Sequence, residues 1–324
     1  MSVMSYGLAI NSAHRIMLEK YEECFVIGQG VNNPWFVGKT TVGLVDEFSQ
    51  RRVMDTPICE SAMAGAAIGA AMAGMKPIAF FPRMDFMYLA LDQIINHCAS
   101  WNYMFNGQVN VPVVLRGIVN RGGEQGAQHS QSPLALYANI PGLKVVCPAT
   151  PKDAKGLLIA AVEDKNPVIF IDDRWLYDLE EEVDDGYYKT PIGKANVLLE
   201  GSDVTIVAAS YMVKVAMSAA RTLKEKGINC EVVDLRTIKP LDEETVLAST
   251  AKTNRAVIAV AEWDFASVSS HVAQIIYKNQ FRTLKSAIEK VNLPNVPAPA
   301  SNALEKVYYP DENSVIEAVM KVMA

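Results

Sequence analysis

The sequence has no cluster of basic residues, and its 324 residues carry a formal net charge of −6. Proteins that bind nucleic acids present Lys and Arg side chains to the phosphates, so this charge argues against a nucleic-acid partner. The Ala- and Gly-rich apolar segment 61–75 spans only 15 residues, short of the roughly 20 that cross a bilayer. The N-terminus shows no basic segment followed by an apolar core, so we expect neither secretion nor a membrane role.

Metal-ligand spacing and C-x-x-C pairs are also missing from the sequence. The cysteines are dispersed and odd in number, at Cys24, Cys59, Cys98, Cys147 and Cys230. We expect reduced, buried thiols in a cytoplasmic protein.

The length suits two domains of roughly 150 residues each. In the first half, apolar runs alternate with helical patterns, at residues 24–28, 77–81, 111–116, 143–147 and 167–172. Continuous apolar strands between amphipathic helices are typical of a parallel sheet covered on both faces. The sequence therefore predicts an α/β fold with a doubly wound sheet.

An acidic, turn-prone stretch at residues 178–188 interrupts this alternation. Beyond it the pattern restarts, with strands expected at 203–209, 228–235 and 255–262 and a helix at 212–226 closed by Gly227. We predict a first domain at residues 1–180, a linker at 181–192 and a second, smaller doubly wound domain at 193–324.

Glu60 is the single charged residue between Asp55 and Lys76, and it opens the small-residue helix. A carboxylate in this setting is expected to be buried, which is costly unless it is protonated or hydrogen-bonded. Glu60 is therefore the leading candidate for a functional residue. Gly65 and Gly69 share one helix face, which another helix of this chain or a second subunit could approach closely.

Several motifs follow one another in an order typical of a known family. They are D-T-P-I-C-E (55–60), the small-residue helix, M-D-F (84–86) with A-L-D-Q-I-I-N (90–96), G-A-Q-H-S-Q-S (126–132) and P-G-L-K-V-V-C-P-A-T-P (141–151). Together they resemble the beta subunit of the thiamine-diphosphate-dependent 2-oxo acid dehydrogenases, the decarboxylating component of pyruvate, branched-chain and acetoin dehydrogenase complexes. The resemblance continues to the C-terminus and implies a pyrimidine-binding domain followed by a transketolase-type C-terminal domain.

The resemblance implies roles for three side chains. Glu60 would hydrogen-bond the N1′ nitrogen of the aminopyrimidine, favouring the imino tautomer that takes the proton from the thiazolium ring and leaves a nucleophilic ylid. Phe86 would stack on the pyrimidine, and His129 would stabilise charged intermediates or exchange protons with them. Taken alone, Glu60 would suit a helix N-terminus, Phe86 a core position and His129 a structural loop.

The family often holds a structural potassium ion through main-chain carbonyls and one aspartate. The resemblance places its ligands at Val113, Ala161, Asp164 and Asn166.

The family signature for Mg²⁺ and diphosphate, G-D-G followed by N-N, is absent, and so are the Rossmann and Walker phosphate motifs. The resemblance implies that a separate alpha subunit binds Mg²⁺ and the diphosphate in an α2β2 tetramer. A lipoyl-domain acyltransferase would receive the acyl group.

The sequence departs from the family pattern close to the expected substrate channel. Phe80 stands where an acidic residue is usual and Arg83 where a hydrophobic one is usual, and Ile118, Arg121 and Glu124 are unusual in the loop before His129. Arginine binds carboxylates or phosphates in a planar fork, so we hypothesise that Arg83 or Arg121 binds a second anionic group of the substrate. Surface ion pairs, for instance with Glu124, are the alternative.

The sequence therefore favours the beta subunit of an enzyme that oxidatively decarboxylates a pyruvate-like 2-oxo acid. Two alternatives remain open. The first is a subunit of a split transketolase-like or acetoin-cleaving enzyme on the same scaffold, and the second is a non-catalytic interaction subunit.

Overall fold

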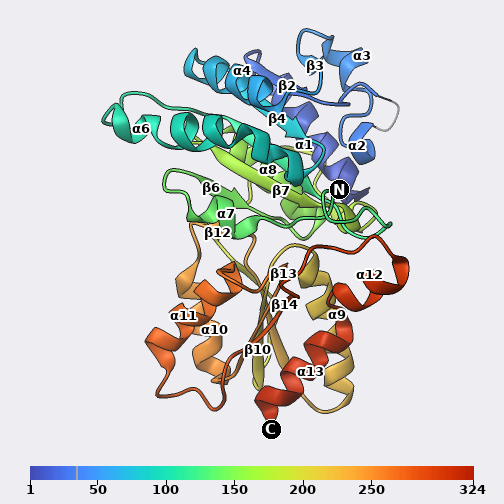
Figure 1. The fold of residues 1–324 in the computed structure, drawn as a ribbon, viewed down its shortest axis with the longest axis vertical. Helices are drawn as coiled ribbons and strands as arrows, with labels where there is room; N and C mark the ends of the chain where they lie inside the picture. The colour runs from blue at the N-terminus through green and yellow to red at the C-terminus, as the bar shows by residue number, and fades with distance from the viewer. Residues whose placement is uncertain (34–35) are drawn as a thin grey trace. The chain divides into compact units, whose positions relative to one another are not determined.

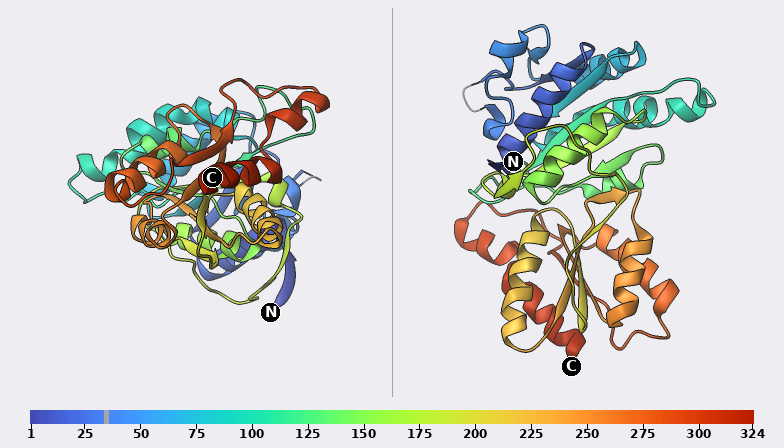
Figure 2. Two further views of the ribbon diagram at one scale, coloured as in Figure 1. Left: turned by 90° about the horizontal axis from the view of Figure 1, so that it is seen from below. Right: turned by 180° about the vertical axis from the view of Figure 1, so that it is seen from behind.

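The computed structural model describes residues 1–33 and 36–324. These residues form two compact units, one of residues 1–121 with 136–192 and one of residues 122–135 with 193–324. Figures 1 and 2 trace the helices and strands of each unit along the chain.

The first unit is built on parallel strands in the order β6-β7-β5-β4-β2-β3. Their bounds are β2 (Cys24–Gly28), β3 (Val53–Asp55), β4 (Lys76–Phe81), β5 (Val114–Val119), β6 (Lys144–Val146) and β7 (Val168–Asp173). Almost every residue of these strands is buried, because helices cover both faces of the sheet. This confirms the doubly wound sheet that the apolar runs predict.

The long helices of this unit are α1 (Tyr6–Lys20), α4 (Glu60–Met72) and α8 (Pro151–Val162). Helices α1 and α8 pack against each other on one face, whereas α4 packs on the other face against β4 (Figures 1 and 2). The remaining elements are β1 (Ser2–Ser5), which pairs antiparallel with β8 (Glu180–Val183), and the short helices α2 (Phe36–Lys39), α3 (Leu44–Phe48), α5 (Met84–Met87), η1 (Tyr88–Ala90), η2 (Gln93–Ala99), α6 (Trp101–Met104), α7 (Leu134–Asn139) and η3 (Arg174–Leu176).

The second unit contains a smaller sheet in the order β14-β13-β10-β11-β9, in which only β9 runs antiparallel to its neighbour. Its strands are β9 (Asn196–Leu199), β10 (Val204–Ala208), β11 (Cys230–Asp234), β13 (Ala256–Trp263) and β14 (Glu289–Leu293), and β12 (Thr237–Lys239) follows β11 in the chain. Its helices are α9 (Tyr211–Glu225), α10 (Glu243–Thr253), α11 (Val268–Gln280), α12 (Asn302–Tyr308) and α13 (Glu312–Met323). Gly227 follows α9 with a φ of +82°, as expected for a residue that closes a helix.

The start of strand β5 and the exposure of Cys59 differ from the sequence expectations. Strand β5 begins at Val114 rather than at residue 111, because Pro112 has no N–H to donate to a ladder. Cys59 is exposed, whereas the other four free cysteines are buried. Pro57 and Ile58 before it are apolar, but it lies at the N-cap of α4, outside the packed part of the helix. No helix among the described residues combines the length and apolarity needed to cross a membrane.

A buried carboxylate stabilises the start of α11 in the second unit. Glu262, on β13, accepts the backbone N–H of Ser269 at 3.1 Å. Ser267 caps the same helix by accepting the N–H of Ser270 at 3.1 Å. Burial raises the pKa of Glu262 to about 8, although the helix N–H groups and Lys290 oppose this effect.

This raised pKa predicts a pH-dependent stability. Because the pKa in the folded state lies above the ordinary value of 4.5, the folded protein keeps a proton that the unfolded chain releases as pH rises toward 8. The stabilisation is therefore complete below about pH 4.5 and is lost as pH rises through about 8. Glu262→Gln keeps the acceptor without the charge. Its advantage over wild type in free energy of unfolding should be larger at pH 8.5 than at pH 5, by about 4 kcal/mol.

Urea denaturation at several pH values measures this difference. Glu225→Gln, which removes an exposed carboxylate from α9, is the matched control and should show no such trend. An equal effect of Glu262→Gln at both pH values would contradict the prediction.

Candidate functional site

The expected site residues of the first unit follow the carboxyl ends of its parallel strands. Phe81 of β4, Gly117 of β5 and Ile171 of β7 lie side by side in register. Arg83, Arg121 and Arg174 come within four residues of these positions, and the chain leaving β3 leads into α4 at Glu60. Ligands of open α/β sheets bind at this edge, because the loops and helix N-termini converge there.

Glu60 is the first residue of α4 and is only 4% exposed. The helix N-terminus favours a negative charge at this position. Its carboxylate nevertheless forms no hydrogen bond or ion pair with any residue of the ranges 1–33 and 36–324. A shielded carboxylate is costly without a partner, so Glu60 is suited to a group supplied from outside the chain.

Phe86 lies on the short helix α5, directly after β4, and is partly exposed. Met84 and Met87 of the same helix are buried against β5 at Gly117. A Cβ atom at Gly117 would lie 2.2 Å from the Met84 sulfur, so this glycine allows α5 to approach the sheet. The absence of a side chain at Gly117 therefore helps to set the position of Phe86.

Arg83 is half-buried between β4 and α5. Its Nη1 donates to the carbonyl of Pro82 at 2.7 Å, and its Nε is buried without a hydrogen-bond acceptor among the described residues. Burial lowers the pKa of Arg83, and the like charge of Arg174 lowers it further, while Asp85 opposes both effects. Arg174 lies at the same edge and was not among the residues that the sequence suggested; its place directly after an apolar strand is the signal that could have found it.

Arg121 is buried, and its Nε donates to Asp173 at 2.6 Å. The expected alternative, a surface ion pair with Glu124, is therefore wrong. Glu124 belongs to the second unit, where its carboxylate accepts the N–H of Asn302 at 3.1 Å and its own N–H donates to Glu305 at 2.9 Å.

His129 lies in the segment 122–135, which belongs to the second unit, whereas Glu60 and Phe86 belong to the first. The imidazole is partly exposed, and the backbone N–H of His129 donates to the carbonyl of Gly126 at 3.3 Å. Gly126 has a φ of +71°, a conformation that suits glycine in a tight loop.

The four residues expected to bind potassium lie at the opposite, amino edge of the first sheet. Val113 accepts the N–H of Val168 at 3.0 Å, and Ala161 accepts the N–H of Asp164 at 3.3 Å. Asp164 accepts the N–H of Asn166 at 2.9 Å and also pairs with the ammonium group of Lys144. Within the described ranges, no three His, Cys, Asp or Glu side chains form a cluster that could hold a metal ion.

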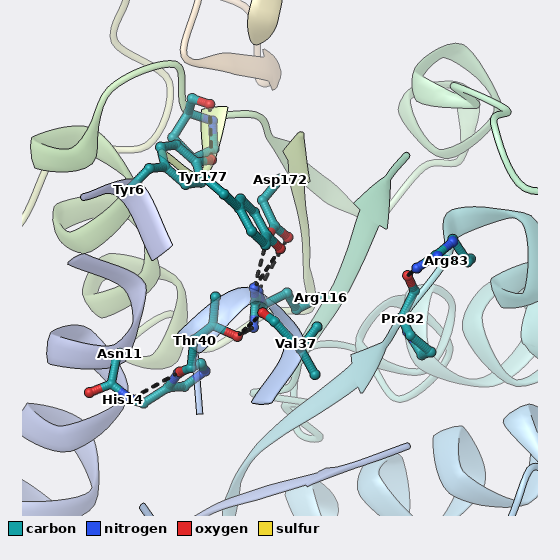
Figure 3. A network of polar contacts seen from close by, with 11 residues as sticks. Tyr6, Asn11, His14, Val37, Thr40, Pro82, Arg83, Arg116, Asp172 and Tyr177 are labelled. Atoms are coloured by element: carbon teal, nitrogen blue, oxygen red, sulfur yellow. Dashed lines mark hydrogen bonds and ion pairs between the residues drawn. The ribbon is translucent and has the colours of Figure 1, made fainter. Parts of the chain in front are cut away.

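A buried polar network lies beneath the carboxyl edge (Figure 3). Arg116 of β5 donates to both oxygens of Asp172, to the Tyr177 hydroxyl at 3.2 Å and to Thr40 Oγ1 at 3.1 Å. Burial alone would lower the pKa of Arg116, but the adjacent Asp172 raises it, so the guanidinium stays charged. Burial lowers the pKa of His14 to about 3, so this imidazole is neutral and its Nδ1–H donates to the Thr40 carbonyl at 3.0 Å.

This network fixes a loop of unusual backbone conformation. Val37, Gly38 and Lys39 have φ values of +44°, +66° and +68°, a region that costs energy for residues with a side chain. The Tyr177 ring packs against Gly38, where a Cβ atom would lie 2.2 Å from the ring. Contacts to Thr40 and Gly38 therefore hold the strained segment in place.

The fold and this edge define a transketolase-type thiamine-diphosphate protein. The pyrimidine-binding domain of transketolase matches residues 2–179, and the C-terminal domain of transketolase matches residues 193–315. A solved structure described as a split gene transketolase, an inactive beta4 tetramer, superposes with a TM-score of 0.80 at 23% identity, over 99% of this chain and 98% of the other.

Relatives that match nearly the whole chain identify the family within this class of proteins. The chain is 44% identical over 314 residues to the pyruvate dehydrogenase E1 component subunit beta of Rickettsia felis, covering 97% of this chain and 96% of the relative. It is 42% identical to the 2-oxoisovalerate dehydrogenase subunit beta of Bacillus subtilis, over 100% of this chain and 99% of the relative. It is 39% identical to the acetoin:2,6-dichlorophenolindophenol oxidoreductase subunit beta of the same organism, over 99% of this chain and 97% of the relative. The chain belongs to this family of beta subunits of 2-oxo acid and acetoin dehydrogenases.

The buried network leads to a prediction about stability. Arg116→Met leaves Asp172 buried without its cation, so it should lower the free energy of unfolding by about 3–5 kcal/mol. The double variant Arg116→Met/Asp172→Asn removes the uncompensated charge, so its free energy of unfolding should fall less than that of Arg116→Met. Urea denaturation of both variants gives the comparison.

Arg15→Met is the matched control, because it breaks a half-exposed ion pair with Glu47 and should cost at most about 1 kcal/mol. A double variant as unstable as Arg116→Met would show that the buried charge is not the cause.

Proposed function

We propose that this chain is the beta subunit of a thiamine-diphosphate-dependent 2-oxo acid dehydrogenase that decarboxylates a 2-oxo acid and passes the acyl group to a lipoyl carrier. One observation carries the proposal. Glu60 is a buried carboxylate without a hydrogen bond or ion pair to the described residues, at the ligand-binding edge of a pyrimidine-binding domain.

Glu60 suits an aminopyrimidine ring. A carboxyl group placed beside a ring nitrogen can share a proton with it. When bound, thiamine diphosphate supplies the electron sink that decarboxylation of a 2-oxo acid requires. The task of Glu60 is to keep one proton at the pyrimidine nitrogen and to exclude water from that contact.

Phe86 and His129 complete the proposed set of side chains. The aromatic face of Phe86, on the helix held by Gly117, suits stacking against a heterocycle. His129 carries an imidazole that can exchange protons near neutral pH, and we assign it to charged intermediates or acyl transfer.

An alpha subunit would provide the diphosphate and Mg²⁺ site that the chain lacks. The outer face of α4 supports such a partner: Gly65 and Gly69 are exposed, and a Cβ atom at Gly69 would meet nothing within 4 Å. The neighbouring segment exposes large apolar side chains, namely Leu89, Tyr103, Met104 and Phe105. Apolar surfaces of this kind mark protein interfaces, and an α2β2 tetramer would cover them.

A potassium ion at Val113, Ala161, Asp164 and Asn166 would support the amino edge of the first sheet. The carbonyls of Val113 and Ala161 and the carboxylate of Asp164 are oxygen ligands of the kind that hard cations prefer. Lys144, already paired with Asp164, would have to share that carboxylate with the ion.

Acetoin cleavage is the main competing function, because one of the relatives is named as the beta subunit of an acetoin oxidoreductase. An acetoin-cleaving enzyme on this scaffold would use the same activation of the cofactor but would break a different carbon–carbon bond. Parallel assays of acetoin cleavage, ketol transfer and lipoamide-dependent oxidation of 2-oxo acids would separate these functions.

Glu60→Gln tests the proposal. In the complex with the alpha subunit and thiamine diphosphate, kcat should fall about 10²- to 10⁴-fold, since the variant can no longer hold an acidic proton at the ring. The midpoint of thermal unfolding of the chain without cofactor should stay the same or rise, because the variant removes a shielded carboxylate that no described residue pairs with.

Glu19→Gln, at an exposed position of α1, is the matched control and should leave both quantities unchanged. Full turnover by Glu60→Gln, or strong turnover by the purified chain without an alpha subunit, would contradict the proposal.

A further inference from the structure

We propose that Arg83 and Arg174 form an anion-binding pair that selects a 2-oxo acid with a second, distal carboxylate. The inference rests on the proposed function and names the class of its substrate. It is carried by the geometry of the carboxyl edge of the first sheet, by the unsatisfied donor of Arg83 and by the charge balance around the pair.

The two arginines extend from strands that share one neighbour. Arg83 comes two residues after Phe81 of β4, and Arg174 comes three residues after Ile171 of β7. Strand β5 separates β4 from β7, so the strand ends from which the two arginines extend lie about 10 Å apart, two strand spacings. Two long guanidinium side chains at this separation can contact one anion between them.

Arg83 has a donor available for such an anion. Its Nη1 is satisfied by the Pro82 carbonyl, as Figure 3 shows, whereas its buried Nε lacks an acceptor among the described residues. A buried donor without an acceptor is costly, and a carboxylate oxygen would satisfy it with a charge-assisted hydrogen bond.

The charges around the pair leave the edge positive. Arg121 pairs with Asp173, and Asp172 pairs with Arg116, so neither of these carboxylates is available to neutralise Arg83 or Arg174. Asp85 and Tyr177 also act on Arg83, and the like charge of Arg174 lowers its pKa more than Asp85 raises it. An anion between the two guanidinium groups would relieve their repulsion.

The chemistry of decarboxylation identifies which carboxylate is bound. The carboxylate next to the oxo group loses its charge as CO₂ forms, so two cations on it would stabilise the ground state more than the transition state and slow the reaction. A distal carboxylate keeps its charge throughout. A cationic pair near Phe86 therefore serves a second acidic group without retarding the chemistry.

Kinetics with two substrates of the same shape test the proposal. The full chain is combined with its alpha subunit, thiamine diphosphate and an artificial electron acceptor, and turnover of 2-oxoglutarate is compared with that of 5-methyl-2-oxohexanoate, which has an isopropyl group in place of the distal carboxylate. The wild type should prefer 2-oxoglutarate, and Arg83→Gln should lower the ratio of the two kcat/KM values about 10- to 100-fold. The loss should lie in KM for 2-oxoglutarate, because the contact persists from ground state to transition state.

Three further variants sharpen the result. Arg83→Lys keeps the charge but not the fork and should recover part of the preference. Arg174→Gln should act in the same direction as Arg83→Gln. Arg51→Gln removes an exposed arginine at the amino end of β3, away from the carboxyl edge, and should leave the ratio unchanged.

Calorimetric titration of the full chain with 2-oxoglutarate separates failure of this inference from failure of the proposed function. If wild type binds 2-oxoglutarate and Arg83→Gln binds it at least about tenfold more weakly, the anion pair is supported even when neither acid is turned over. The lack of turnover would then contradict only the proposed dehydrogenase activity. A wild-type preference for the neutral analogue, or equal binding and equal ratios in wild type and Arg83→Gln, overturns the inference.

Discussion

A shielded carboxylate that has no partner among residues 1–33 and 36–324 is the constraint on which the rest of this molecule depends. Other buried acids are compensated internally: Asp172 by Arg116, Asp173 by Arg121 and Glu262 by the N–H groups of α11. Glu60 has the helix N-terminus and no hydrogen bond to the described residues. The sequence around it is almost free of charge, so no salt bridge can form locally, and compensation has to come from a bound group.

The parallel sheet explains why this carboxylate lies where a ligand can reach it. Parallel strands need crossover helices, so the loops that follow the strands of the first parallel sheet all lie at the same edge. Glu60, Phe86 and the arginines Arg83, Arg121 and Arg174 lie at that edge. The pairing of Lys144 with Asp164 stabilises the opposite, amino edge. The network around Arg116 supports the carboxyl edge from below and holds the strained loop at Val37 to Lys39.

The sequence predicts the parts of this structure that depend on local pattern. Continuous apolar runs identify β2, β4 and β7 because a doubly covered sheet buries every residue of its strands. The pairing of Arg121 could not be predicted, because Asp173 lies 52 residues away and becomes a neighbour only through the β5–β7 register. For the same reason local reasoning coupled Arg121 to Glu124, which the fold places in the other unit. The burial of Glu60 follows from its uncharged surroundings, whereas the role of Arg174 requires knowing which strands are adjacent.

Because Glu60 forms no hydrogen bond or ion pair with the described part of the chain, stability, cofactor binding and assembly are linked. A ligand that binds only the folded chain stabilises it in proportion to the logarithm of its concentration over its dissociation constant. A hydrogen bond from this chain to Glu60 would stabilise the free subunit, but the same bond would compete with the ring nitrogen for the proton. The exposed small-residue face of α4 imposes a similar compromise, since it weakens packing within the subunit and leaves room for a partner. Because Glu60 opens the very helix that presents this face, a partner that covers α4 also excludes water from the carboxylate, and binding of the partner and of the cofactor should reinforce each other.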